Sequence, residues 1–386
     1  MRIPDQTIKL KDYHHAVEVA LADPATPVYI DTSVLMWLIR VGTEARREFL
    51  NWCRTSLAGR VVIPTWALHE LYHHLREGTI PLEISQKAAA YKKNLSDILS
   101  EVSLTADSAI SVKSGYATAA ELVAQTRERI IKIHDFLTKW EAEKARYDQA
   151  TAEVVEFAND RLISSRLFSL LDVVSTTRDI RIEGRIPPGY KDAHKPENAV
   201  GDLVLWQEVL KDLELRSPPP AQAIIITKDE KSDWYCKPFK VEAYDGKVKG
   251  ENHEVGLEAK LPHPMLEHEL KLKTNTTTLF VINPRILAVI LDKTSPKAFQ
   301  ALTMVTHPKT TSPKSTGLNY KVLGYPPPPE PPEEEGAESP AESPDLSAID
   351  FKTTCVFKSP PLTRDGALVF CIRVVGLKGN GHAHAF

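Results

Sequence analysis

The segment AIIITKDEKSDW, residues 223–234, decides the fold of this 386-residue chain. Its apolar run AIIIT is typical of a strand that is buried on both faces in the middle of a parallel sheet. Three further stretches have the pattern of buried strands: VYI at 28–30, RVVIP at 60–64 and TLFVI at 278–282. Helical patterns lie between them, at 34–41, 65–77, 263–272 and 284–291. This alternation predicts an α/β fold with a parallel sheet and helices on both sides.

A long helical stretch interrupts the pattern between the second and third strands. Its apolar positions alternate three and four residues apart, first at Ile84, Ala88, Tyr91, Leu95, Ile98 and Val102, and then from Ala119 through Val123, Thr126, Ile130, Ile133, Leu137 and Trp140 to Lys144 and Tyr147. Such spacing is typical of a coiled-coil seam. We therefore predict an antiparallel helical hairpin that turns around Gly115, within an insertion over about residues 83–176.

The remaining regions are predicted from composition. Residues 305–345 are rich in proline and glutamate and read as a linker, because they hold too little apolar area to fold. Two strand-like runs follow, and they predict a small C-terminal β hairpin module over 346–386. The α/β domain is expected over 25–304, which leaves 1–24 as an N-terminal extension.

Composition excludes several classes of protein. No run approaches 18 apolar residues, which argues against a membrane-spanning helix. The N-terminus lacks the pattern of a secretory signal. None of the four cysteines forms a CxxC pair, which argues against a disulfide scaffold and a structural zinc ribbon. A reduced, cytoplasmic protein that does not enter a membrane is the expectation. The net charge is −3, but residues 326–345 hold seven acids and no Lys or Arg. The rest of the chain is therefore slightly basic, which permits phosphate contacts.

Three aspartates occupy positions where ligands bind to parallel sheets. Asp31 directly follows the first strand, Asp229 follows the third strand by one residue, and Asp202 lies in the first turn of a helix. The carboxyl ends of parallel strands form one edge of a sheet, and acids gathered there need a cation such as Mg²⁺ or Mn²⁺. Each acid also has an ordinary structural role open to it: Asp31 as a helix N-cap, Asp202 as a partner of the helix dipole and Asp229 in a turn.

The helix after the second strand contains His69-Glu70-Leu71-Tyr72-His73, which matches the HExxH pattern of zinc peptidases. Both histidines lie on one face of the helix, and Glu70 could be the base. No metzincin-type third ligand follows, and the pattern is short enough to arise by chance. A zinc peptidase is kept as an alternative, and Glu70 is kept as a candidate fourth acid of the metal site.

Lysines lie close to these acids in the sequence. Pro187-Pro188-Gly189 predicts a sharp loop that brings Lys191 and Lys195 near Asp202, while Lys228 and Lys231 flank Asp229. Lysines beside a metal site are natural phosphate contacts, although a solvated loop would have the same composition. Walker A, GxGxxG and GxSxG motifs are absent from the sequence.

Four segments together resemble the PIN-like nucleases: YIDTSVLMW, VVIPTWALHEL, RIPPGYKDAHKPENAVGDLVLWQEVL and IIITKDEKSDWY. The similarity covers roughly residues 25–295 and is to the branch with a long helical insertion. It implies a three-layer α/β/α fold and cleavage of RNA, or sometimes DNA, with Mg²⁺ or Mn²⁺. By position, the resemblance implies metal-binding and catalytic acids at Asp31, Glu70, Asp202 and Asp229, a fifth metal ligand at Asp233, and supporting hydroxyls at Thr32, Ser33 and Thr227.

The leading hypothesis is therefore a metal-dependent phosphodiesterase that acts on RNA in preference to single-stranded DNA. Toxin and host-defence roles are common among PIN-like proteins, so an effector role is a hypothesis by analogy. A regulated scaffold is a further alternative, in which the helical hairpin binds a protein partner or a second copy of the chain.

Overall fold

The computed structural model describes residues 7–163, 167–195, 198–250 and 259–306. All of them belong to one compact unit, Met1–Gly324. The predicted hairpin at 346–386 and the predicted linker beyond residue 306 lie outside the described residues. The helix α14 (Gln300–Thr306) runs to Thr306, so the ordered domain extends slightly past the boundary expected at 304.

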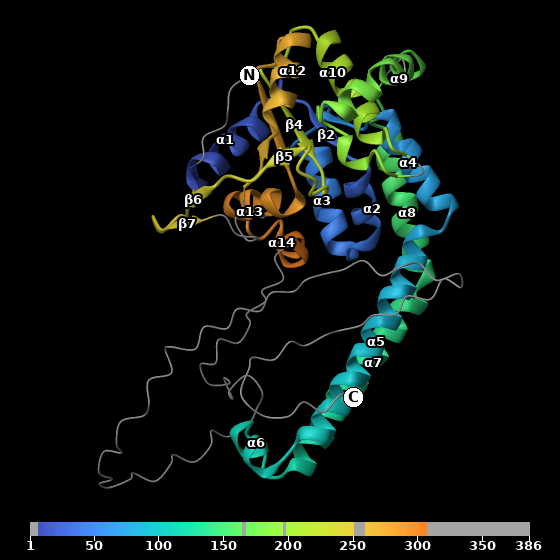
Figure 1. The fold of residues 1–386 in the computed structure, drawn as a ribbon, viewed down its shortest axis with the longest axis vertical. Helices are drawn as coiled ribbons and strands as arrows, with labels where there is room; N and C mark the ends of the chain where they lie inside the picture. Colours follow the sequence, from blue (N-terminus) through green and yellow to red (C-terminus); the bar gives the residue numbers. More distant parts are fainter. Residues whose placement is uncertain (1–6, 164–166, 196–197, 251–258, 307–386) are drawn as a thin grey trace, which may run out of the picture. The chain divides into compact units, whose positions relative to one another are not determined.

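A four-stranded parallel sheet forms the centre of the unit (Figure 1). Its strand order is β3 (Val61–Val62), β2 (Val28–Ile30), β4 (Gln222–Ile226) and β9 (Thr278–Ile282). Val28 pairs with Ile224, and Ile225 pairs with Val281. β4 lies between two other strands, and four of its five residues are buried, as its continuous apolar run predicts.

Helices surround this sheet, and the predicted three-layer α/β/α arrangement is confirmed. These helices are α2 (Thr32–Arg40), α3 (Thr43–Thr55), α4 (Thr65–Arg76), α10 (Gly201–Leu215), α12 (Pro264–Lys273) and α13 (Pro284–Thr294). Three of the strands lead directly into a helix, β2 into α2, β3 into α4 and β9 into α13, whereas β4 is followed by short strands. The helices pack on the sheet because each carries an apolar stripe that the sheet covers.

The N-terminal residues are part of the fold and not an extension of it. β1 (Thr7–Lys9) pairs in parallel with β6 (Lys240–Glu242), which also pairs with β7 (Val248–Gly250). α1 (Leu10–Ala22) buries Tyr13 and Val17 in the main core. The signal for α1 was present in the sequence, because its buried residues Leu10, Tyr13, Val17 and Ala20 have the three- and four-residue spacing of an amphipathic helix, but the prediction did not use it.

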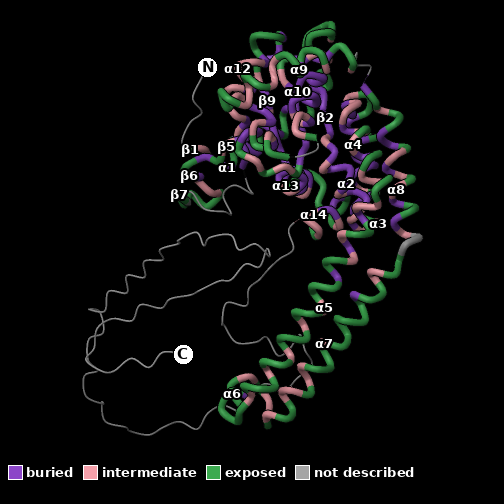
Figure 2. The backbone as a smooth tube through the Cα atoms, turned by 45° about the vertical axis from the view of Figure 1, so that its right-hand side comes forward, coloured by how far each residue is buried: buried purple, intermediate pink, exposed green. Residues whose placement is uncertain are grey.

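The predicted helical hairpin is present, with one difference. α5 (Thr79–Thr105) and α7 (Ala119–Ala142) pack against each other, with the short α6 (Ser108–Lys113) at the turn. Figure 2 shows that both helices are largely exposed, whereas buried residues concentrate around the sheet. Ile133 and Tyr91 are exposed although the seam pattern places them inside.

The seam also ends earlier than its rhythm predicts. The helix breaks at Glu143, and α8 (Lys144–Asn159) packs into the body through Tyr147, Val154 and Phe157, followed by α9 (Leu167–Glu183). A buried ion pair between Arg46 Nε and Glu153 Oε2, 2.7 Å apart, joins α8 to α3. Within the described ranges, no helix is both long enough and apolar enough to cross a membrane.

Candidate acidic site

Asp31 lies at the carboxyl end of β2 and is held by hydroxyl groups. Its Oδ2 accepts hydrogen bonds from Ser33 Oγ at 2.5 Å and from Thr227 Oγ1 at 2.6 Å. Asp31 occupies the N-cap position of α2, but its side chain makes no capping hydrogen bond. The carboxylate is therefore fixed by the hydroxyls that the resemblance names and is directed to the edge of the sheet.

Asp229 is fixed by the turn that follows β4. Its backbone N–H donates to Thr227 Oγ1 at 2.9 Å, and its Oδ1 accepts from the backbone N–H of Lys231 at 2.8 Å. Thr227 therefore contacts both Asp31 and Asp229. Asp229 thus takes part in a turn, as one of its predicted roles requires. Only its Oδ1 is used in the turn, so Oδ2 can contact a second partner.

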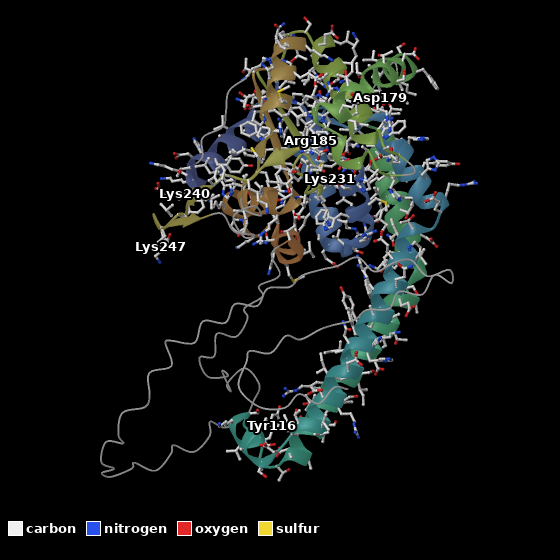
Figure 3. The ribbon with its side chains drawn as sticks, viewed as in Figure 1. Tyr116, Asp179, Arg185, Lys231, Lys240 and Lys247 are labelled. Carbon is white, nitrogen blue, oxygen red and sulfur yellow. The ribbon has the colours of Figure 1, made fainter. Side chains whose placement is uncertain are left out.

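That second partner is the ammonium group of Lys231. Lys231 Nζ lies 2.7 Å from Asp229 Oδ2, 2.6 Å from Asp202 Oδ2 and 2.7 Å from Asp192 Oδ2. Figure 3 labels Lys231 among the elements that surround the edge of the sheet. The three carboxylates come from the loop after β4, from the first turn of α10 and from the short 3-10 helix η1 (Tyr190–Asp192). One cation thus gathers acids from three distant segments.

Glu70 is the fourth predicted acid, and three donors hold it. Thr32 Oγ1 and Asn198 Nδ2 donate to its two oxygens, and Trp66 Nε1 donates to Oε1 at 3.1 Å. Gly201 permits this arrangement, since a Cβ at that position would lie 2.5 Å from Glu70 Oε1. Thr32 follows Asp31 directly, so Glu70 is tied to the same edge of the sheet.

The charges of these acids affect one another. The pKa of Asp202 is raised to about 7, chiefly by burial, although Lys231 opposes the increase and Asp229 and Asp31 add to it. Burial also raises the pKa of Asp31, with repulsion from Glu70 and Asp229 as further causes. Asp31, Glu70, Asp202 and Asp229 therefore form one electrostatic group with too much negative charge for its degree of burial.

Asp233, predicted as a fifth ligand, has a different position. Its Oδ2 accepts from the backbone N–H groups of Gly189 at 3.0 Å and Lys191 at 3.2 Å, and the residue is fully buried. These contacts hold the PPGYKD loop against the segment after β4. Asp233 therefore supports that loop through Oδ2, while its buried Oδ1 has no hydrogen-bond partner among the described residues, and its role as a fifth metal ligand stays a prediction.

The four predicted phosphate-binding lysines also differ from one another. Lys231 and Lys195 are ion-paired, with Lys195 Nζ 2.6 Å from Asp192 Oδ2. Lys228 Nζ lies 5.9 Å from the centre of the Trp37 ring, and burial lowers its pKa. Lys191 is exposed, and its Nζ lies 5.8 Å from the centre of the Tyr190 ring. Lys191 and Lys228 are thus the two whose ammonium groups point away from the acids.

Sequence reasoning missed three residues of this site: Asp192, Asn198 and Trp66. Asp192 stands within the PPGYKD segment, whose acid could have been counted with the others. Asn198 and Trp66 carry no sequence signal, because their role depends on where Glu70 points in the folded chain.

The geometry gives the zinc peptidase alternative no specific support. Glu70 is held by Thr32 and Asn198, and the rings of His69 and His73 lie edge to face with centres 4.8 Å apart. Across the described residues, no three His, Cys, Asp or Glu side chains are arranged to hold a metal ion as they stand. At the acidic site the carboxylates are not arranged around an empty point, because the ammonium of Lys231 occupies the point where they converge.

Comparison with known families supports the motif-based resemblance. The family model for the PIN-like domain matches residues 27–244, which is more than half of the chain and includes every acid of the site. The chain belongs to the PIN-like domain family. No curated protein and no solved structure matches it. The PIN-like domain has a nuclease-type fold, and its match here places the acid-bearing strand ends, α4 and the PPGYKD loop inside the family's own boundaries.

Proposed function

We propose that this PIN-like domain is a metal-dependent phosphodiesterase that cleaves single-stranded nucleic acid, RNA in preference to DNA. The observation that carries the proposal is the convergence of Asp192, Asp202 and Asp229 on one cationic point, with Asp31 beside them. An acid cluster with this degree of burial is costly for the fold unless a cation neutralises it.

The donor set fits Mg²⁺ or Mn²⁺. Both ions prefer carboxylate oxygens, and the ammonium of Lys231 stands where a cation is bound by three of them. We propose Asp31, Asp202 and Asp229 as the residues that would hold the ion, with Glu70 assisting. When bound, a divalent ion supplies a water of lowered pKa and polarises the phosphoryl group.

The chain's own residues supply orientation and charge. Ser33 and Thr227 fix Asp31, while Thr32, Trp66 and Asn198 fix Glu70, so neither carboxylate needs to reorient during the reaction. A divalent ion between Asp202 and Asp229 would displace the Lys231 ammonium from them, and Asp192 would remain as its partner. Lys191, Lys195 and Lys228 would contact the backbone without reading its sequence.

The proposed reaction also defines the products. Water, and not the 2′-hydroxyl, attacks the phosphorus and the P–O3′ bond breaks, which leaves 5′-phosphate and 3′-hydroxyl ends. The same chemistry acts on RNA and DNA, so any preference must come from contacts outside the acids.

A cleavage assay tests the proposal. Labelled single-stranded RNA and DNA are incubated with Mn²⁺, Mg²⁺, Zn²⁺ or EDTA, and wild type is compared with Asp31→Asn and Asp229→Asn. Asp97→Asn, an exposed acid of α5, is the matched control. We expect cleavage with Mn²⁺ or Mg²⁺ that falls by at least about 100-fold in both site variants and persists in the control. Cleavage that survives both site variants would overturn the assignment.

A further inference from the structure

A cavity lies on the side of α4 next to Glu70. It has a volume of about 540 Å³, within the range of small-ligand sites. One wall is the face of α4 that carries Trp66, His69 and His73, and the other is the segment Asn198–Val200. Glu70 also lines the cavity, so the cavity adjoins the acidic site described above.

The α4 wall is a row of aromatic rings. The centres of Trp66 and His69 are 5.0 Å apart, and those of His69 and His73 are 4.8 Å apart. Their spacing of three and four residues places all three on one helical face. His69 and His73 are exposed, whereas Trp66 is partly buried against the cluster of Val174, Leu203 and Val204.

Trp66 is a rigid part of this wall. Its backbone N–H donates to Glu208 Oε2 at 2.8 Å, and its indole N–H donates to Glu70 at 3.1 Å. A rigid aromatic surface loses little conformational freedom when a planar group stacks on it. The rings of the wall are inclined to one another, Trp66 and His69 at 47° and His69 and His73 at 87°, so a planar group that stacks on one ring meets the next ring with its edge.

The charge of the cavity selects between the parts of a nucleotide. Glu70 and Glu77 both line it, and two carboxylates disfavour the entry of a phosphate. A nucleobase is uncharged, and every base has a face that stacks on aromatic rings. The acids at the edge of the sheet, by contrast, would hold the scissile phosphate through the metal ion proposed above.

We propose that this cavity binds the base of a nucleotide next to the scissile phosphate, with His69 and His73 as stacking residues. The proposal rests on the proposed function and makes the substrate a single strand, because a base paired in a duplex cannot enter the cavity. The link between cavity and acids is Glu70, which lines the cavity and accepts a hydrogen bond from Thr32, the neighbour of Asp31.

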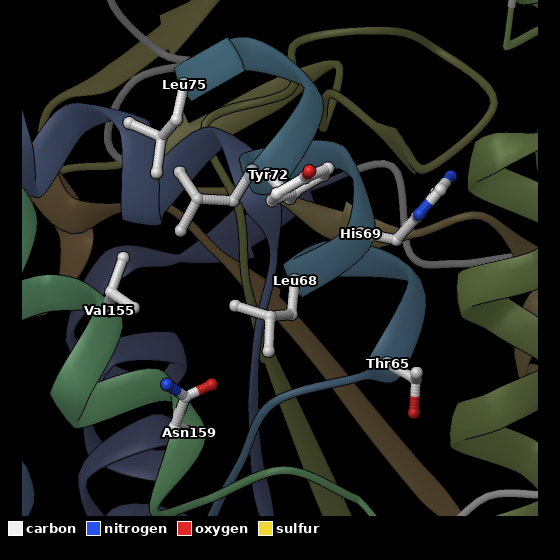
Figure 4. Close-up of a pocket in the computed structure, with 8 residues that line it drawn as sticks. Thr65, Leu68, His69, Tyr72, Leu75, Val155 and Asn159 are labelled. Atoms are coloured by element: carbon white, nitrogen blue, oxygen red, sulfur yellow. The ribbon is translucent and has the colours of Figure 1, made fainter.

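The other side of α4 offers a matched control. Figure 4 shows a second pocket, where Leu68 and Leu75 point toward Val155 and the His69 ring points away from them, although His69 and Tyr72 also line this pocket. Tyr72 is an exposed aromatic residue of the same helix that does not line the cavity next to Glu70. Its ring lies edge to face with that of His73, with ring centres 6.4 Å apart, so its removal takes away a neighbour of a stacking residue but no part of the cavity wall.

The test measures binding of fluorescent single-stranded oligonucleotides in EDTA, where the proposed cleavage does not occur. The proteins are wild type, the double variant His69→Ala/His73→Ala, and Tyr72→Ala, each checked for its melting temperature. A set of oligonucleotides carries one abasic position moved along the strand. We expect the double variant to bind about 5- to 50-fold more weakly than wild type, and Tyr72→Ala to lose much less than the double variant. One abasic position should weaken wild type by a similar factor and leave the double variant unaffected.

Three results would count against the inference. Equal binding by wild type and the double variant overturns it, and this is also the result expected if a protein side chain is the natural occupant of the cavity. Equal binding of duplex and single strand overturns it as well. If the wild-type protein neither binds nor cleaves any oligonucleotide, both the proposed function and this inference are overturned. If the wild-type protein cleaves and the double variant binds as tightly as wild type, only this inference is overturned.

Discussion

Replacing Asp202 by Asn should stabilise the metal-free protein while removing the response to metal. The pKa of Asp202 rises from 3.8 to about 7, first because the carboxyl is buried and also because Asp229 and Asp31 repel its charge. The positive charge of Lys231 offsets only part of this rise in the pKa of Asp202. The ionised carboxylate is therefore a cost to the folded state, and the neutral amide removes that cost.

The magnitude and its pH dependence follow from linkage. A group whose pKa is raised on folding holds its proton more tightly in the folded chain, so the cost is absent below about pH 4 and complete above about pH 7. A change from 3.8 to about 7, at roughly 1.4 kcal/mol per pH unit, corresponds to about 4 kcal/mol. The buried amide keeps some desolvation cost of its own, so we expect Asp202→Asn to gain about 2 to 4 kcal/mol at pH 8 and little at pH 4.

The assay is urea unfolding in EDTA at pH 4 and pH 8, repeated with Mn²⁺ at pH 8. Asp192→Asn is the matched control with the opposite expected sign. Burial alone would raise the pKa of Asp192, but hydrogen bonds from Lys195 and Lys231 outweigh burial and lower it. Asp192→Asn should therefore lose stability at pH 8. A loss of stability in Asp202→Asn at pH 8 would refute the reasoning, because it would mean that the ion pair with Lys231 outweighs burial.

Three other substitutions test separate contacts of the site. Lys231→Met should lower the free energy of unfolding by about 2 to 4 kcal/mol in EDTA at pH 8, because it leaves three carboxylates without their cation. Mn²⁺ should restore most of this loss, and equal urea unfolding curves with and without Mn²⁺ would contradict the prediction. Gly201→Ala should displace Asn198 and Glu70, since its Cβ would lie 2.4 Å from Asn198 Oδ1 and 2.5 Å from Glu70 Oε1, and should reduce cleavage by about 10-fold or more. Unchanged cleavage would show that the position of this pair does not matter to the reaction. Asp233→Asn should lower the free energy of unfolding by about 1 to 3 kcal/mol, because an amide oxygen accepts the two backbone N–H groups less strongly than a carboxylate does. The loosened loop should be cleaved faster by trypsin after Lys191, and a tryptic rate equal to that of wild type would argue against the loop-supporting role.

Much of the central fold could be predicted from local pattern. VYI at 28–30 and TLFVI at 278–282 form strands with the predicted bounds, and AQAIIIT contains β4. Short apolar runs rich in β-branched residues are typical of strands covered on both faces, and their shortness and their alternation with helical patterns distinguish them from buried helices. The strands β1 and β6 were missed, since short strands with mixed polarity have no local signature, whereas the periodic signal of the N-terminal helix α1 was present and not used.

The sequence by itself also placed Asp31 and Asp229 at one edge of the sheet, because each follows a parallel strand whose end is fixed by its apolar run. Only the tertiary structure decided that Lys231 joins Asp229 to Asp192 and Asp202, which lie 39 and 29 residues away from it. It also decided that Asp233 supports a loop and that Glu70 faces Thr32 and not the two histidines beside it. Hydrophobic periodicity determines which face of an element is buried. The direction of a polar side chain depends on partners that distant segments bring to it.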